Sequence, residues 1–167
     1  MPLADTLLRL AAAPGLYLPK WTDQIMIEVS RNLRENFGLS AEQAACRESE
    51  IRRHFPEAWV DGYQELIPSM TNNEKDRHVL AAAVRANVEL IVTYNAKDFP
   101  HAALAPYSIT VQGPSTFLTT LYQLDPNAVG QVLEQQAAAI NRQVEYVLDR
   151  LHINAPHFVD IIRSHKQ

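Results

Sequence analysis

The chain has 167 residues, of which 47% are hydrophobic and 20% are charged, as is typical of one globular domain or of one domain with an appendage. The net charge of −4 argues against a scaffold that binds nucleic acid through a broadly basic surface, but it is neutral on a nuclease whose metal ions supply positive charge. No hydrophobic run approaches the length of a membrane span, and the N-terminal residues show no secretory signal pattern. We therefore expect a cytoplasmic protein without membrane contacts, in which the single cysteine, Cys46, is a plain thiol.

The first third of the chain predicts helices joined by short strands. Apolar residues at helical spacing predict helices over residues 2–13, 22–37 and 40–54. Thr22 is placed to cap the second helix and Gly38 to end it, whereas Ser40 and Gln43 can form a capping box at the start of the third. Short apolar runs predict brief strands at residues 16–18 and 59–60.

Residues 72–100 read as a turn, a helix, a buried strand and a polar loop. An asparagine at the start can cap a helix whose first turn contains Asp76, and the apolar residues 90–92 predict a strand that is buried on both faces, as in a parallel sheet covered by helices. Polar residues that include Asp98 follow this strand directly. Because ligands bind at the carboxyl ends of strands in open α/β sheets, we expect Asp76 and Asp98 to meet at one rim.

The rest of the chain predicts one more strand and then helices only. The strand is expected over residues 108–112 and is followed by a helix to about residue 124, so the order helix, strand, loop, strand suits a parallel sheet. The composition changes at Asp125-Pro126, and the residues after it predict three helices and no strand. These helices either pack on the domain or contact a partner.

Two segments of the central stretch resemble the second half of a PIN domain. They are Asp-Arg-His-Val-Leu-Ala-Ala-Ala at residues 76–83 and Ile-Val-Thr-Tyr-Asn-Ala-Lys-Asp-Phe-Pro at residues 91–100. PIN domains are metal-dependent nucleases, and the group includes the VapC toxins of toxin–antitoxin pairs. The resemblance implies an α/β fold, in which a three-layer PIN-like domain with a central parallel sheet flanked by helices occupies residues 1–124 and a helical extension occupies residues 125–167.

The resemblance also implies a function, a cofactor and partners. The function is that of a Mg²⁺-dependent endoribonuclease, a hydrolase that cuts single-stranded or structured RNA with a metal-activated water. The enzyme would be the toxin of a toxin–antitoxin pair, and its partners would be RNA, a small antitoxin protein and a second copy of the chain. Mn²⁺ is the alternative metal, since both ions prefer oxygen ligands.

The candidate metal ligands are Glu28, Asp76 and Asp98. Each has a plain alternative role, on a helix flank, in a first helical turn or in a loop turn, and the resemblance favours the metal. Closely packed carboxylates repel, so at least one of them should have a raised pKa in the metal-free protein. Thr93 and Asn95 are candidates to orient a metal-bound water or Asp98, and otherwise they are ordinary residues of a strand end and a turn.

Other polar residues receive weaker assignments. Arg31, Asn32 and Lys97 are candidate contacts to the RNA substrate. His78 follows Asp76 by two residues, and we expect it at the surface or in a helix hydrogen bond rather than on a metal. The sequence contains no glycine-rich phosphate loop and no Gly-x-Ser-x-Gly elbow.

One element of the PIN pattern has no counterpart here. PIN domains begin with a hydrophobic strand that ends in a metal-binding aspartate, whereas the present chain begins with a predicted helix that contains Asp5. We therefore expect further residues upstream, or a strand supplied by another chain, and poor metal binding by the 167-residue form. Two alternatives stay open, namely a catalytically inactive PIN-like module that binds RNA or protein and an unrelated helical interaction protein.

Overall fold

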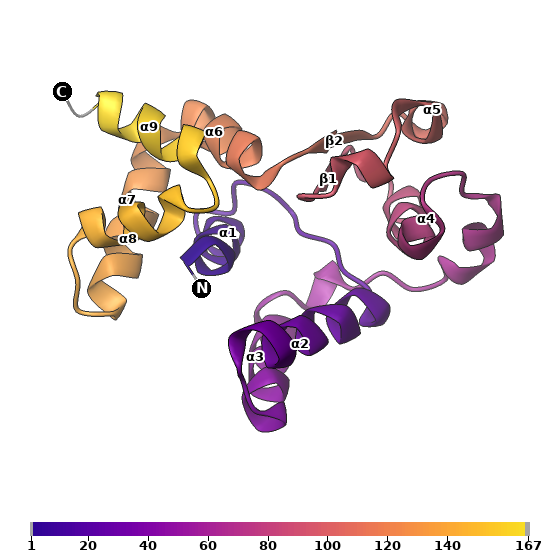
Figure 1. Ribbon diagram of the computed structural model, residues 1–167, viewed down its shortest axis with the longest axis horizontal. Coiled ribbons are helices and arrows are strands. Elements are labelled where there is room, and N and C mark those ends of the chain that lie inside the picture. Colours follow the sequence, from indigo (N-terminus) through magenta and orange to yellow (C-terminus); the bar gives the residue numbers. More distant parts are fainter. Residues whose placement is uncertain (1, 166–167) are drawn as a thin grey trace. The chain divides into compact units, whose positions relative to one another are not determined.

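The computed structural model describes residues 2–165, which divide into two compact units (Figure 1). The first unit comprises residues 2–18, 92–96 and 111–165, and the second comprises residues 19–91 and 97–110. The strands are β1 (Leu90–Val92) and β2 (Thr110–Gln112). The α-helices are α1 (Pro2–Ala12), α2 (Asp23–Phe37), α3 (Ala41–His54), α4 (Arg77–Arg85), α5 (His101–Leu104), α6 (Pro114–Leu124), α7 (Pro126–Ala139), α8 (Val144–His152) and α9 (Pro156–His165).

The first unit is built mainly from α1 and from the four helices α6 to α9. Helix α7 packs against α1, α6 and α8, and α9 packs against α6 and α8. The core of this unit consists of apolar side chains that are fully or almost fully buried, among them Leu10, Leu118, Val129, Val132, Leu148, Leu151 and Phe158. The helices predicted after residue 125 are thus confirmed, and they share a core with α1 and α6. The division into domains after residue 124 stays a prediction.

A buried polar contact joins α1 to α7. The Thr6 hydroxyl lies 2.7 Å from Gln136 Oε1 and 2.8 Å from the carbonyl oxygen of Pro2, so its single proton can be donated to either oxygen. Gln136 Nε2 donates to the same Pro2 carbonyl at 2.9 Å. Both side chains are almost completely buried. Because unpaired polar groups are costly in an apolar core, this network favours one register of α1 on α7.

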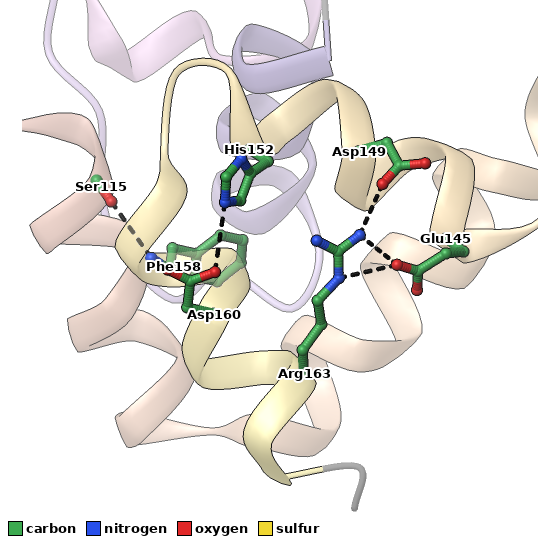
Figure 2. Close-up of polar contacts among 7 residues, drawn as sticks. All are labelled: Ser115, Glu145, Asp149, His152, Phe158, Asp160 and Arg163. Carbon is green, nitrogen blue, oxygen red and sulfur yellow. Dashed lines mark hydrogen bonds and ion pairs between the residues drawn. The ribbon is translucent and has the colours of Figure 1, made fainter.

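Polar contacts connect α9 to α8 and α6 (Figure 2). The Arg163 guanidinium reaches back from α9 to two acids of α8, donating to Glu145 Oε1 at 2.8 Å and to Asp149 Oδ1 at 2.7 Å. At the start of α9, the backbone N–H of Phe158 donates to the Ser115 hydroxyl of α6. The ion pairs are exposed and add little stability, so the apolar core holds these helices together.

The second unit begins with the helix pair α2 and α3, and both helices carry the predicted caps. The Thr22 hydroxyl accepts a hydrogen bond from the backbone N–H of Ile25, and Gly38 ends α2 with a φ of +67°. Ser40 and Gln43 form a complete capping box at the start of α3. Local hydrogen bonds of this kind depend on residues three positions apart, which is why the sequence predicts them well.

The strands β1 and β2 form a two-stranded parallel sheet. The pairing includes hydrogen bonds from Thr110 N–H to the Glu89 carbonyl and from Thr93 N–H to the Gln112 carbonyl, both 2.9 Å long. Ile91 is buried, but Val92 is 36% exposed. The prediction that residues 90–92 would be buried on both faces was therefore wrong for Val92.

Two further strand predictions were wrong. Residues 16–18 have no regular structure, and at residues 59–60 only Trp59 forms an isolated bridge, with Trp21. The part of the chain that the structure describes is mostly helical with one small parallel sheet, which is compatible with an α/β fold. The three-layer arrangement stays a prediction. No helix in this part is long and apolar enough to cross a membrane.

Candidate functional site

A short turn in front of α4 brings the two predicted aspartates together. The turn is the 3₁₀ helix η3 (Glu74–Asp76), and Asn73 caps it by accepting a hydrogen bond from the Lys75 N–H through its side-chain oxygen. Asn73 also binds Asp98 twice, since its backbone N–H donates to the Asp98 carbonyl and its Nδ2 donates to Asp98 Oδ1, each at 3.1 Å. The backbone N–H of Asp76 in turn donates to the Asn73 carbonyl at 2.9 Å. Asn73 therefore holds both acids at one place in the second unit.

Asp98 is the buried member of the pair. It lies at the end of the 3₁₀ helix η4 (Ala96–Asp98), and its side chain is only 7% exposed. Its Oδ1 accepts from Asn73, but its Oδ2 has no hydrogen-bond donor among residues 2–165. The nearest cation is the Lys75 ammonium, whose Nζ lies 3.2 Å from Oδ2 as an ion pair. A buried carboxylate oxygen without a donor is costly unless a cation compensates it.

Asp76 lies beside this carboxylate and is less deeply buried. Its side chain is 21% exposed, and its Oδ2 also has no hydrogen-bond donor within the described residues. Burial raises the pKa of Asp76 above its ordinary value and the neighbouring Asp98 raises it further, while Lys75 and His78 act in the opposite direction. The pKa of Asp76 is thus raised as expected, but burial is the main cause and the repulsion by Asp98 is a smaller one.

Glu28 contacts His78 rather than the aspartate pair. The Glu28 side chain projects from α2 and is 43% exposed, and its Oε1 lies 3.4 Å from Nε2 of His78. The His78 side chain is only 4% exposed, so the expectation of a surface position was wrong. His78 also acts on Asp76, whose pKa it lowers through its charge. Among residues 2–165, no group of three or more His, Cys, Asp or Glu side chains is gathered closely enough to hold a metal ion.

The aspartate pair nevertheless has the chemistry of a divalent cation site. Two carboxylate oxygens, Asp76 Oδ2 and Asp98 Oδ2, are buried, lie close together and have no donor in the described structure. Mg²⁺ is commonly held by one or two carboxylates together with several waters and substrate phosphates. The chemistry of this pair is therefore compatible with such an ion, and the assignment of Asp76 and Asp98 as its ligands stays a prediction. The inclusion of Glu28 as a third ligand stays a prediction.

The side chains of the remaining predicted residues make no hydrogen bond or ion pair with the aspartate pair within the described residues. Thr93 and Asn95 belong to the first unit, where the Asn95 N–H donates to the Thr93 hydroxyl at 3.1 Å in a local turn. Arg31, Asn32 and Lys97 are exposed in the second unit, as substrate contacts require. Arg31 lines a surface cavity of about 370 Å³ at the junction of α2 and α3. The roles proposed for these residues stay predictions.

Sequence reasoning missed three residues of the site. Asn73 was expected only as a helix cap, with Asn72 as the alternative, Lys75 was assigned no role, and His78 was expected at the surface or in a helix hydrogen bond. The signal available for the first two was their position beside Asp76 in the sequence Asn-Asn-Glu-Lys-Asp. Nothing in that pattern shows that Asn73 and Lys75 also reach an acid that lies more than twenty residues further along the chain.

Comparison with known proteins gives one informative match. No protein-family model matches the chain, and no solved structure matches it. A protein of Mycobacterium tuberculosis (strain H37Rv) named "Putative ribonuclease VapC50" is 56% identical over 68 residues, which are 41% of this chain. The match spans only 39% of the length of that relative. The identity supports a VapC-like relationship for the matched part of the chain, and the ribonuclease activity is that of the relative by name.

Proposed function

We propose that the protein is a metal-dependent endoribonuclease of the PIN/VapC type. The observation that carries this proposal is the meeting of Asp76 and Asp98, which come from distant parts of the chain and present buried oxygens without hydrogen-bond donors. The likeness to a protein named as a VapC ribonuclease supports the same function. Mg²⁺ or Mn²⁺ is the proposed cofactor. When bound, it would supply an activated water and stabilise negative charge at the scissile phosphate.

The side chains of the chain itself have distinct tasks in this proposal. Asp76 and Asp98 hold the cation, and Asn73 keeps Asp98 in position through two hydrogen bonds. His78 orients Glu28, which completes the acidic site either as a direct ligand or through a water. Arg31, Asn32 and Lys97 contact RNA phosphates, where the positive charges of Arg31 and Lys97 are locally favourable.

The partners follow from the same proposal. The substrate is RNA, and a small antitoxin protein controls the enzyme, as the VapC name of the relative suggests. A homodimer and a cytoplasmic location belong to the proposal as well. The second candidate function is a catalytically inactive RNA- or protein-binding module. The observation that favours it is the absence of a third metal-ligating side chain beside the aspartate pair within residues 2–165.

Cleavage of RNA by matched variants tests the proposal. The wild-type chain is incubated with structured and single-stranded RNA in Mg²⁺, in Mn²⁺ and in a chelator, alongside Asp98→Asn and Asp76→Asn. Asp61→Asn serves as a control, because Asp61 is an exposed acid of the same unit. We expect metal-dependent cleavage that each site variant lowers about a hundredfold or more, since outer-shell changes alone already cost 10–100-fold at metal sites. Cleavage that persists in chelator, or that Asp98→Asn leaves unchanged, contradicts the proposal. RNA binding without cleavage by the wild type supports the inactive module instead.

A further inference from the structure

The ammonium group of Lys75 lies at the aspartate pair. Its Nζ is 3.2 Å from Asp98 Oδ2 and 3.9 Å from Asp76 Oδ2. Among the residues that the structure describes, no other side-chain cation makes an ion pair with either carboxylate. Lys75 is therefore the local source of positive charge for two acids that would otherwise repel each other.

The ammonium and a divalent cation would use the same oxygens. The Oδ2 atoms of Asp76 and Asp98 are the ones that lack hydrogen-bond donors and that face Lys75. A Mg²⁺ ion binds carboxylate oxygen at about 2.0–2.1 Å. An ammonium held at its present distance would then stand next to a doubly charged ion, and the two like charges would repel each other in a partly buried site. One Lys75 charge also neutralises only half of the charge of the two ionised acids.

The Lys75 side chain is far more exposed than the carboxylates that it contacts. The Lys75 side chain is 63% exposed, whereas that of Asp98 is 7% exposed and is fixed by Asn73. The backbone of Lys75 is held in place by the hydrogen bond from its N–H to the Asn73 side chain. The ammonium can therefore swing into solvent on its flexible stem while the backbone and both carboxylates stay in position.

We propose that Lys75 is an internal counter-ion that occupies the aspartate pair in the metal-free protein and leaves it when a divalent cation binds. This inference rests on the metal-dependent function proposed above. Lys75 is then a positioning residue that sets the metal affinity. It competes with the cation for Asp98 Oδ2 and prevents the two carboxylates from repelling each other when no metal is present.

Titration of metal into charge variants of Lys75 tests this inference. Binding of MnCl₂ and MgCl₂ to the metal-free chain is measured by calorimetry for the wild type, Lys75→Met and Lys75→Arg. Lys20→Met is the matched control, because it removes the same charge from a lysine whose ammonium donates to the Glu57 carbonyl and to no carboxylate. Displacing a half-exposed ion pair is a small effect, so we expect Lys75→Met to lower the Kd about three- to tenfold. Lys75→Arg and Lys20→Met should stay close to the wild type.

A second measurement uses the wild-type chain and does not depend on the folding of a variant. The reactivity of each lysine amine toward acetylation is followed by mass spectrometry with and without Mg²⁺. We expect the labelling of Lys75 to become faster with metal, and that of Lys20 to stay unchanged.

The outcomes separate the two proposals. The metal site stands if the wild type binds metal and Asp76→Asn abolishes the binding. The counter-ion role is wrong if, in addition, Lys75→Met binds metal with the wild-type Kd and the labelling of Lys75 does not respond to metal. If neither the wild type nor Lys75→Met binds Mn²⁺ or Mg²⁺, both proposals fall together.

Discussion

Replacing Asp76 by asparagine is expected to stabilise the metal-free protein at neutral pH. In the wild type, Asp76 Oδ2 is buried without a donor and lies next to a second acid, and burial followed by that neighbour raises the pKa of Asp76. Asparagine has nearly the same shape but no charge, and its Nδ2 can donate to Asp98 Oδ2. A change that removes a predicted metal ligand should thus make the fold more stable, as is common at functional sites.

The magnitude follows from three contributions. A buried polar group without a partner costs about 1–3 kcal/mol. Lys75 Nζ lies 3.9 Å from Asp76 Oδ2 and is exposed, so with the dielectric constant of water its attraction offsets about 1 kcal/mol. The same ammonium is 3.2 Å from Asp98 Oδ2, so the two carboxylate oxygens are at most about 7 Å apart and repel each other by at least about 0.6 kcal/mol. The free energy of unfolding should therefore rise by about 0.5–2.5 kcal/mol in Asp76→Asn.

The pH dependence of this difference identifies its cause. Because the pKa of Asp76 is raised in the folded state, its contribution to stability is fully present below the unfolded pKa of about 3.9 and is lost as the pH rises through the folded pKa. Wild type and variant should hence be equally stable near pH 4 and diverge toward pH 7.5. Titrating groups that do not interact with Asp76 are common to both chains and cancel in the comparison.

Urea unfolding in chelator, followed by circular dichroism across this pH range, measures the difference. Asp61→Asn is the control and should change stability by less than about 0.5 kcal/mol at every pH, because Asp61 is exposed. Added Mg²⁺ should stabilise the wild type and not Asp76→Asn, by about 2.7 kcal/mol at a concentration of 100 Kd. A variant that is less stable than the wild type at pH 7.5, or a difference that does not depend on pH, would refute the reasoning.

Three further predictions concern the helices of the first unit and the end of α2. Thr6→Val removes the donor to the buried Gln136 Oε1 and should lower the free energy of unfolding by about 1–3 kcal/mol, which thermal denaturation would show as a drop of about 2–12 °C. Phe158→Ala empties a fully buried site and should lower the free energy of unfolding by about 3–5 kcal/mol, whereas Arg163→Ala removes exposed ion pairs and should lower it by less than about 1 kcal/mol. Equal losses of stability in chemical denaturation would contradict the assignment of Phe158 to the core. In Gly38→Ala the added methyl group has no neighbouring atom within 4 Å, but the alanine must adopt a φ of +67°. The free energy of unfolding in urea should therefore fall by about 1 kcal/mol, and an unchanged value would show that backbone strain is unimportant there.

The candidate site shows where sequence reasoning succeeds and where it stops. Asp76 and Asp98 could be chosen because their segments resemble a PIN domain, whereas the local patterns alone also fit an ordinary acid of a first helical turn and of a loop turn. Their meeting followed from the rule that ligands gather at the ends of parallel strands. The partners of these acids could not be chosen, because Asn73 and Lys75 carry the same local signals as ordinary capping and surface residues.

Glu28 and His78 also show which features of the site the sequence predicts and which it does not. The sequence gives Glu28 a position on a helix flank, and that position is correct. It does not say that the buried imidazole of His78 lies within 3.4 Å of the Glu28 carboxylate. The burial of His78 depends on the way α4 packs in the second unit, and the pattern of apolar residues around it is also typical of an exposed helix start.

The sequence alone determined the positions of α1, α2 and α3, the caps of α2 and α3 and the change to an all-helical composition after Asp125. Each of these depends on residues within one or two turns of one another, so the signals are complete within a short window. Tertiary structure decided which polar atoms lost contact with water and which charges came to face each other. Those outcomes depend on contacts between segments distant in the chain, because burial and Coulomb interactions are properties of position in space, and local spacing does not contain them.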